Sequence, residues 1–409
     1  MALPNSPKFS SKGSAPAACK ISLKECFADF KDPRREHGRQ HLLWDIVAIT
    51  ICGVISGADS WVDVADYATC KRDFFESFLE LPNGIPSHDT IGRVFARLDP
   101  EAFSRSFQKW VAALVEATEG RIIAIDGKTL RHSFDTAAGK KPLHLVSAWA
   151  TANNLTLGQR AVDDKSNEIT AIPELLDLLD IHGAVVTIDA MGCQKDIAEQ
   201  IVAAGGDYVL SLKENQPTLC ADVETLFLGA LDNDFAGVVH HAFTTTEKRQ
   251  RHGRWESRQY HILAAPPELC QDHPEWTKLK TVGMVISERQ VLGQEATYET
   301  RYFISSLPPK VKSFAQAVRG HWGIENQLHW VLDVQFKEDQ SRLRAGYGAK
   351  NMAVVRHFAI NLIRRADDKR SIKTRRKLAG WDTDYLHSLI SSSPFLTWTR
   401  CPGLGVELG

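Results

Sequence analysis

Two stretches, RIIAIDG (121–127) and AVVTIDA (184–190), decide the fold of this chain. Each is a continuous apolar run, typical of a strand that is covered on both faces of a sheet. Asp126 and Asp189 follow these runs directly, and a small residue follows each aspartate. A lone aspartate in this position usually caps a turn. Two of them, at the carboxyl ends of neighbouring strands where open α/β sheets bind ligands, predict a shared site.

The sequence around these runs alternates in the manner of an α/β fold. Further strands are predicted over His144–Ala150, Leu155–Val162 and Tyr208–Leu212, and helices over Ile169–Leu179 and Lys195–Ala204. Because strand and helix alternate after Val162, part of the sheet is expected to be parallel. Residues 240–306 return to a strand pattern, and residues 311–365 show helical spacing.

Residues 21–120 are predicted to be helical, with a proline- and glycine-rich connection, LPNGIPS, at 81–87. Ser87 is a suitable N-cap for a helix that directs Ile91, Val94, Phe95 and Leu98 inward. Arg93 and Arg97 then share the outer face, where they either remain solvated or contact phosphate.

Length and composition set broad limits. A chain of 409 residues with 43% hydrophobic and 24% charged residues is expected to form two or three globular units, and it is neither disordered nor fibrous. The longest apolar run, 46–56, is too short to cross a bilayer. Eight scattered cysteines without a CxxC pair argue against a zinc ribbon or a disulfide framework and suit a reducing cytosol.

The net charge of −1 conceals an asymmetry. Residues 341–380 contain twelve Lys and Arg against two Asp, so this segment carries +10 and the rest of the chain −11. A local basic field matters more to a polyanionic partner than the overall balance does. This segment is therefore a candidate for following a DNA backbone, which would make binding strongly salt-dependent.

A third acidic residue is needed for a hard-cation site of three carboxylates. Val318, Trp322, Glu325, His329 and Leu332 share one predicted helical face, so Glu325 is expected within an apolar, core-facing stripe. A carboxylate there requires a metal ion or a buried arginine partner. Asp333, Glu338 and Asp339 are rival candidates. His321 and His329 invite a zinc interpretation, but no cysteines accompany them, and we expect hydrogen-bonded core histidines.

Several ordered motifs resemble the H-repeat-associated, ISAs-type insertion-sequence transposases of the DDE class. They are AIDGKTLR (124–131), KSNEITAIPELL (165–176), TIDAMGCQ (187–194), DYVLSLKENQPTL (207–219), RHGRWESR (251–258) and HWGIENQLHWVLDVQFKEDQSR (321–342). The resemblance extends over about residues 20–390, including GIPSHDTIGRVFARLDP (84–100), which is similar to the family's N-terminal associated domain.

The resemblance implies an α/β, ribonuclease-H-like mixed sheet flanked by helices. The implied organisation is a flexible tail (1–20), a helical N-terminal transposase-associated domain (21–118), a catalytic domain (119–215 and 311–366), a β-rich insertion before the glutamate helix (216–310) and a basic C-terminal tail (367–409). The catalytic, metal-binding acids carry over to Asp126, Asp189 and Glu325. The implied cofactor is Mg²⁺, with Mn²⁺ as a possible substitute, because a pair of such ions supports phosphoryl transfer.

One departure from the wider superfamily concerns its motif Tyr-x2-Arg-x3-Glu-x6-Lys. Around Glu325 the flanking places hold Val318, His321 and Leu332, so only the glutamate is retained. The phosphate contacts credited to that arginine and lysine must come from elsewhere or be absent.

Eight residues are predicted to contact DNA. Lys128, Lys213, Asn215 and Gln216 follow strand ends at the expected site edge, where a solvated turn is the alternative. Arg251, Arg254 and Arg258 surround Trp255, and basic residues around an aromatic ring suit an unstacked base. A hairpin with its tryptophan in the core is the alternative.

The resemblance therefore predicts a transposase that cleaves the ends of its insertion sequence and joins them to target DNA. Its partners would be the terminal inverted repeats and target DNA, without a membrane, and we expect a homodimer in the synaptic complex. The expected location is cytoplasmic, at the nucleoid when DNA is bound. The alternatives are a metal-dependent nuclease without strand transfer and a non-catalytic DNA-binding regulator.

Overall fold

The structure is a computed structural model that describes residues 22–114, 121–134, 139, 141–162, 168–249 and 254–391. The predicted tail (1–20) lies outside these ranges, as do residues 392–409. One mixed sheet of nine described strands, in the order β3-β2-β1-β4-β5-β9-β8-β7-β6, forms the centre of the molecule. The strands are β1 (Ile122–Leu130), β2 (Leu143–Ala150), β3 (Leu155–Val162), β4 (Val185–Ile188), β5 (Asp207–Leu212), β6 (His240–Arg249), β7 (Arg254–Ala264), β8 (Thr281–Val291) and β9 (Thr297–Ser305).

The first five strands confirm the predicted ribonuclease-H-like arrangement. Strands β1, β2 and β3 are antiparallel neighbours, whereas β4 and β5 run parallel to β1. Helices α7 (Glu168–Leu176) and α8 (Lys195–Ala203) provide the crossovers that parallel strands require. The core strands β2 and β4 are almost entirely buried, and the continuous apolar run around β4 predicts this for that strand.

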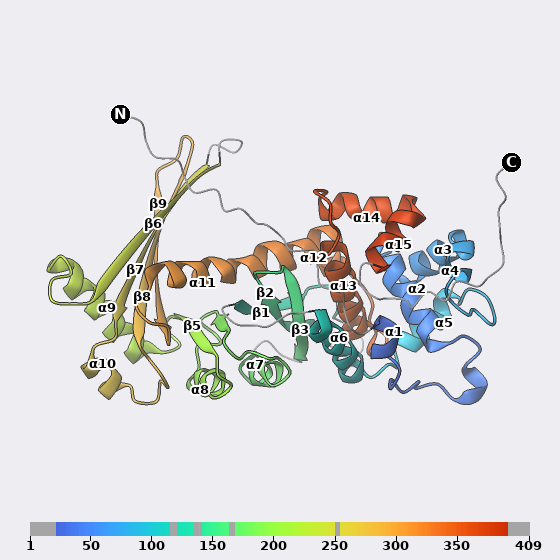
Figure 1. Ribbon diagram of the computed structural model, residues 1–409, viewed down its shortest axis with the longest axis horizontal. Helices are drawn as coiled ribbons and strands as arrows, with labels where there is room; N and C mark the ends of the chain where they lie inside the picture. Colours follow the sequence, from blue (N-terminus) through green and yellow to red (C-terminus); the bar gives the residue numbers. More distant parts are fainter. Residues whose placement is uncertain are drawn as a thin grey trace.

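The β-rich segment continues the same sheet. Strand β9 pairs antiparallel with β5, and β8, β7 and β6 follow outward. Their far ends project beyond the rest of the sheet as long ribbons, whereas helix α9 (Pro217–Asp232) and the short α10 (Pro267–Asp272) lie toward the other ends of these strands (Figure 1). Strand β8 changes from buried to exposed along its length and β9 from exposed to buried, so in both strands the buried end is the one near β5.

A long helix crosses the sheet and connects its two halves (Figure 1). It consists of α11 (Val311–Gly323), a π-helical segment (Ile324–His329) and α12 (Trp330–Gln335). Phe314 of α11 packs edge-on against Tyr260 and Phe303 of the β-rich half. At Gly320 a side-chain carbon would lie 3.0 Å from Ile122, so this glycine permits the close approach of helix and sheet.

The N-terminal and C-terminal helices lie side by side in a helical half (Figure 1). They are α1 (Leu23–Cys26), α2 (Leu43–Ile55), α3 (Trp61–Cys70), α4 (Arg72–Glu76), α5 (His88–Phe95), α6 (Pro100–Leu114), α13 (Gly348–Arg364), α14 (Ile372–Trp381) and α15 (Thr383–Ser391). Ser87 caps α5 as predicted, by accepting a hydrogen bond from the backbone of Thr90. Asn351 of α13 donates to the carbonyls of Phe95 and Leu98. These hydrogen bonds connect the C-terminal helices to the N-terminal helices. No helix in the described ranges has the length and apolar character needed to traverse a bilayer.

The basic segment 341–380 is not a solvated tail. Arg356, Arg375 and Arg376 are buried, and Arg376 donates to the carbonyl of Val54 in α2. Arg375 donates to Asp368 at 2.9 Å. These guanidinium groups hold helices together, so the part of the +10 charge that can face DNA is smaller than the sequence suggests. The exposed cations of the segment are Arg342, Arg344, Lys369, Arg370, Lys373 and Lys377.

Candidate active site

Asp126 and Asp189 lie on neighbouring parallel strands. The last paired residues of β1 and β4 are Ile125 and Ile188, and the two aspartates follow them directly. The backbone of Asp126 still pairs with Ser147 of β2, so β1 extends beyond the five residues predicted for it. The register of the sheet thus places the two carboxylates next to each other, where the pairing of β1 with β4 ends.

The electrostatics of this pair fit a hard divalent cation. Burial raises the pKa of Asp189, and the charge of Asp126 raises it further, with a smaller contribution from Glu168. Two half-buried carboxylates that repel one another are stabilised by a cation with oxygen ligands such as Mg²⁺. Asp126 and Asp189 are therefore the residues of this edge that would hold it.

Two histidines of the long helix meet this edge. His329 Nδ1 lies 3.3 Å from Asp126 Oδ2, and His321 Nδ1 lies 3.2 Å from Thr187 Oγ1 of β4. Our expectation of core histidines missed this placement beside the acids. The sequence does contain a signal for this placement. The two histidines are eight residues apart on one helix, and Glu325 lies midway between them.

The expectation of a buried Glu325 is wrong. Val318 and Leu332 are buried, but Glu325 is exposed. The π-helical segment Ile324–His329 accommodates more residues per turn, so the α-helical spacing behind the prediction does not continue through it. The backbone of Glu325 lies between His321 and His329, on the helix that passes the two aspartates.

The side chain of Glu325 borders a groove of about 990 Å³ between the long helix and the projecting strands. Within the described ranges, no three side chains of the His, Cys, Asp and Glu types converge closely enough to hold a metal ion. The structure therefore brings two of the three predicted acids together and leaves the third at the rim of the groove.

The loop that carries Asp189 is held by two residues predicted to contact DNA. Asn215 donates to the carbonyl of Ala190 at 2.6 Å, and Gln216 donates to that of Cys193 at 3.0 Å. Asp189 itself accepts from the backbone N–H of Gly192 at 3.3 Å. Both amide side chains thus bind protein and fix the loop. Lys213, which follows β5 directly, is exposed.

Lys128 is placed differently from our expectation. Its ammonium group contacts Asp333 and lies 2.8 Å from Glu338 Oε2, and only 10% of the side chain is exposed. Burial by itself would lower the pKa of Lys128, but the carboxylates of Glu338 and Asp333 outweigh it and raise the pKa. Arg356 completes the network at 3.5 Å from Glu338. Asp333 and Glu338, the rival candidates for the third acid, therefore bind Lys128. The charge of Lys128 is neutralised by these carboxylates, so we do not expect it to contact phosphate.

The predicted basic patch around Trp255 is only partly described, because Arg251 and the side chain of Arg254 lie outside the described part of the chain. Trp255 is half-buried. Arg258 is buried, donates to Glu256 at 2.8 Å and stacks over Trp322 with 4.4 Å between the guanidinium carbon and the ring centre. Arg258 therefore forms the wall of the groove that Glu325 borders.

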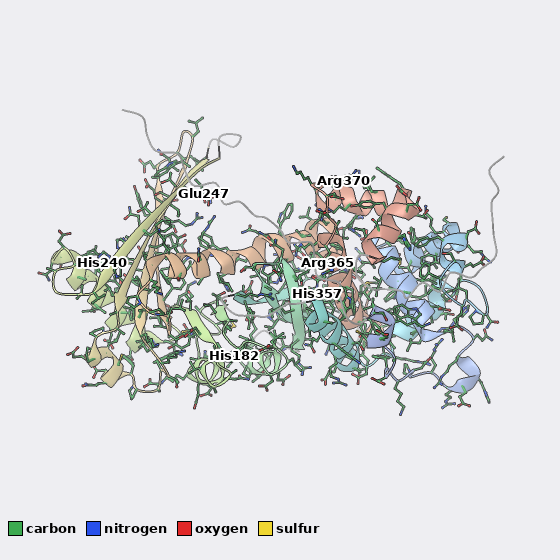
Figure 2. All side chains as sticks on the ribbon, viewed as in Figure 1. His182, His240, Glu247, His357, Arg365 and Arg370 are labelled. Atoms are coloured by element: carbon green, nitrogen blue, oxygen red, sulfur yellow. The ribbon has the colours of Figure 1, made fainter. Side chains whose placement is uncertain are left out.

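That groove is electrostatically mixed. Its wall carries four arginines, but it carries as many glutamates. Arg319, for example, pairs with Glu247, which lies on the projecting strands (Figure 2). The groove thus offers Trp322 and paired guanidinium groups, and it does not present a simple positive field.

Residues 24–111 match the family model described as DDE_Tnp_1-associated, and residues 117–362 match the Transposase DDE domain. The chain is 40% identical to the "H repeat-associated putative transposase YhhI" of Escherichia coli (strain K12), covering 91% of this chain and 98% of that protein. It is also 40% identical to the "Putative transposase YncI" of Escherichia coli O157:H7, covering 91% and 95%. A piggyBac transposase in a synaptic complex with hairpin DNA shows a partial structural likeness, with a TM-score of 0.38 and 12% identity over 93% of this chain and 79% of that chain.

The family match covers more than half of the sequence and includes strands β1 and β4 with the two aspartates, the long helix and the N-terminal helices. The chain therefore belongs to the DDE transposase family.

Proposed function

We propose that this protein cleaves the ends of its own insertion sequence and joins them to target DNA, with Mg²⁺ as the cofactor and Mn²⁺ as a substitute. Cleavage by water and joining by a 3′-hydroxyl are both phosphoryl transfers, so one site serves both steps. The observation that carries the proposal is the parallel register of β1 and β4, which sets Asp126 beside Asp189 at the sheet edge.

The proposed ligands of the metal are Asp126, Asp189 and Glu325. When bound, a pair of Mg²⁺ ions would activate the attacking oxygen, stabilise the leaving oxygen and neutralise the phosphoryl charge. His329 orients the carboxylate of Asp126, and the backbone of Gly192 orients that of Asp189. The exposure of Glu325 on the passing helix keeps its carboxylate accessible from the groove.

DNA is proposed to approach along the groove and over the loops beside Asp189. Lys213 is an exposed cation next to that loop and suits a phosphate contact. Arg254, Trp255 and Arg258 belong to β7 and, together with Arg251, stay proposed contacts near a strand end. The partners would be the element's terminal inverted repeats and target DNA, and a homodimer would hold two ends together.

A strand-transfer assay on the element's own ends tests this proposal. The wild-type protein, Asp126→Asn and Asp189→Asn would be incubated with labelled end DNA and a plasmid, with and without Mg²⁺. We expect Mg²⁺-dependent cleavage and transfer by the wild type, and a loss of at least 100-fold in both variants. Asp196→Asn, at an exposed position in the first turn of α8, is the matched control and should retain activity.

The outcomes separate the alternatives. Cleavage without transfer into plasmid would identify a metal-dependent nuclease. Binding of the ends without metal-dependent cleavage would identify a DNA-binding regulator. Full activity of folded Asp126→Asn would refute the proposed site.

A further inference from the structure

A basic cleft of about 420 Å³ lies in the helical half, between the segment 30–39 and the residues that join α5 to α6. It is at the opposite end of the molecule from the projecting strands, and none of its wall residues borders the groove beside Glu325 (Figure 1). Five cations and two carboxylates line the basic cleft, which leaves its wall with a charge of +3. The cations are Lys31, Arg34, Arg35, Arg39 and Arg97, and the acids are Asp32 and Asp99.

One side of the cleft is built around a buried arginine. Arg34 is only 8% exposed and donates to Asp32 at 2.7 and 3.0 Å and to the carbonyl of His41 at 2.8 Å. Arg39 donates to the carbonyl of Arg34 at 3.0 Å and lies 3.8 Å from the same Asp32 carboxylate. Two guanidinium groups thus share one carboxylate, so this side of the cleft keeps a positive charge in a fixed position.

Arg34 also has an unused hydrogen-bond donor. Its Nη1 is buried and meets no acceptor within the described part of the chain. A buried donor without an acceptor is costly, and an anion in the cleft that Arg34 lines would supply one. The planar fork of a guanidinium group matches the oxygens of a phosphate group, so a phosphate is the anion that suits this wall.

The structure also separates Arg93 from Arg97, for which the sequence left both solvation and a phosphate contact open. Arg93 donates to the carbonyl of Asp89 at 3.1 Å and does not line the cleft. Arg97 lines the cleft together with Arg35, and both are exposed. Among the described residues, neither of these two side chains has a hydrogen-bond or ion-pair partner. Arg35 and Arg97 are therefore available to an incoming ligand.

We propose that the basic cleft binds a phosphate group of the DNA backbone. This inference deepens the proposed function and rests on it, because DNA is the proposed partner. Contacts to backbone phosphates carry no base sequence, so the cleft would hold DNA in position without reading it. Because the two aspartates lie elsewhere, loss of the cleft weakens DNA binding and leaves the reacting groups in place.

DNA binding without Mg²⁺ tests the cleft independently of cleavage. The probe is a labelled short duplex of arbitrary sequence, titrated with the full-length protein at several salt concentrations. Each phosphate contact contributes about 0.9 to the slope of log K against log salt. We therefore expect Arg97→Gln to reduce that slope by about 1 and to weaken binding about eightfold at 0.1 M salt. Arg35→Gln should behave alike. Arg93→Gln removes the same charge from an exposed position four residues away and is the matched control.

Titration calorimetry with inorganic phosphate distinguishes the DNA backbone from a free phosphate compound. Loss of phosphate binding in Arg97→Gln with unchanged DNA affinity would assign the cleft to a free compound and refute the DNA contact. Equal losses of DNA affinity in Arg93→Gln and Arg97→Gln would indicate a diffuse basic surface and overturn the cleft as a site.

The failure of this inference differs from the failure of the proposed function. Unchanged DNA affinity and salt slope in folded Arg35→Gln and Arg97→Gln, with strand transfer by the wild type, would overturn the inference alone. A wild-type protein that binds no DNA would overturn both.

Discussion

Replacing Lys128 by methionine separates a structural role from DNA contact. The ammonium group of Lys128 lies against the buried Glu338 and against Asp333, whose side chain is 32% exposed. Methionine fills a similar volume without the charge. Glu338, which is 1% exposed, would then keep only Arg356 as a cationic partner.

The expected loss of stability follows from the burial of this network. Removing one member of a buried ion pair costs about 3–5 kcal/mol, because a charge is left without its partner. Arg356 lies 3.5 Å from Glu338 and retains part of the compensation. We therefore expect the lower end of the range, about 3 kcal/mol, for Lys128→Met.

Urea unfolding followed by circular dichroism measures this loss, with Lys213→Met as the exposed lysine control. The double variant Lys128→Met/Glu338→Gln should recover about 1 kcal/mol or more, since it removes the stranded charge. The dependence of DNA affinity on salt should be unchanged in Lys128→Met. A loss of stability below about 1 kcal/mol, together with a salt slope reduced by about 1, would show instead that Lys128 contacts phosphate.

Three further predictions concern local geometry. Gly127→Ala places a methyl group against Glu168 and should lower stability by about 1–3 kcal/mol in thermal unfolding. Burial lowers the pKa of His357 to about 4, so this side chain stays neutral in the fold while the unfolded chain takes up a proton below about pH 6.5. Stability should therefore fall by up to about 3 kcal/mol as the pH is lowered from 7 to 4, and His357→Gln should flatten that slope in urea titrations. Asn215→Ala removes a donor from the loop of Asp189 and should slow DNA cleavage about tenfold with little change in DNA affinity, measured by single-turnover kinetics.

Each of these predictions has a contradicting result. Gly229→Ala is the control for Gly127→Ala, because no atom lies within 4 Å of the carbon that it adds. Equal melting temperatures of the two variants would contradict a steric clash between the methyl group added at Gly127 and Glu168. If the stability of His357→Gln falls as steeply between pH 7 and pH 4 as that of the wild type, groups other than His357 cause the pH dependence. A loss of DNA affinity in Asn215→Ala that accounts for its slower cleavage would identify a DNA contact.

The strands and the two aspartates were predictable because their signals are local. The apolar run before Asp189 predicts where β4 ends, whereas β1 continues past Asp126 to Leu130, and Leu155–Val162 was predicted to the residue. The capping of α5 by Ser87 is equally local.

The environments of charged residues were not predictable, because they depend on contacts between distant segments. Lys128 pairs with acids more than 200 positions away, and Arg376 meets a carbonyl of α2. Glu325 was misplaced because a π-helical segment has no clear sequence signature. Glu168 belongs to the quoted motif KSNEITAIPELL, but its burial beside His144 is a tertiary property.

Metal-directed cleavage of the protein backbone tests directly whether Asp126 and Asp189 bind a divalent cation together. Fe²⁺ bound in place of Mg²⁺ generates hydroxyl radicals with ascorbate and peroxide, and these cut the chain near the ion. Our account predicts cuts close to both Asp126 and Asp189 in the wild type, and neither cut in Asp126→Asn. Cuts elsewhere, or cuts that persist unchanged in Asp126→Asn, would contradict it.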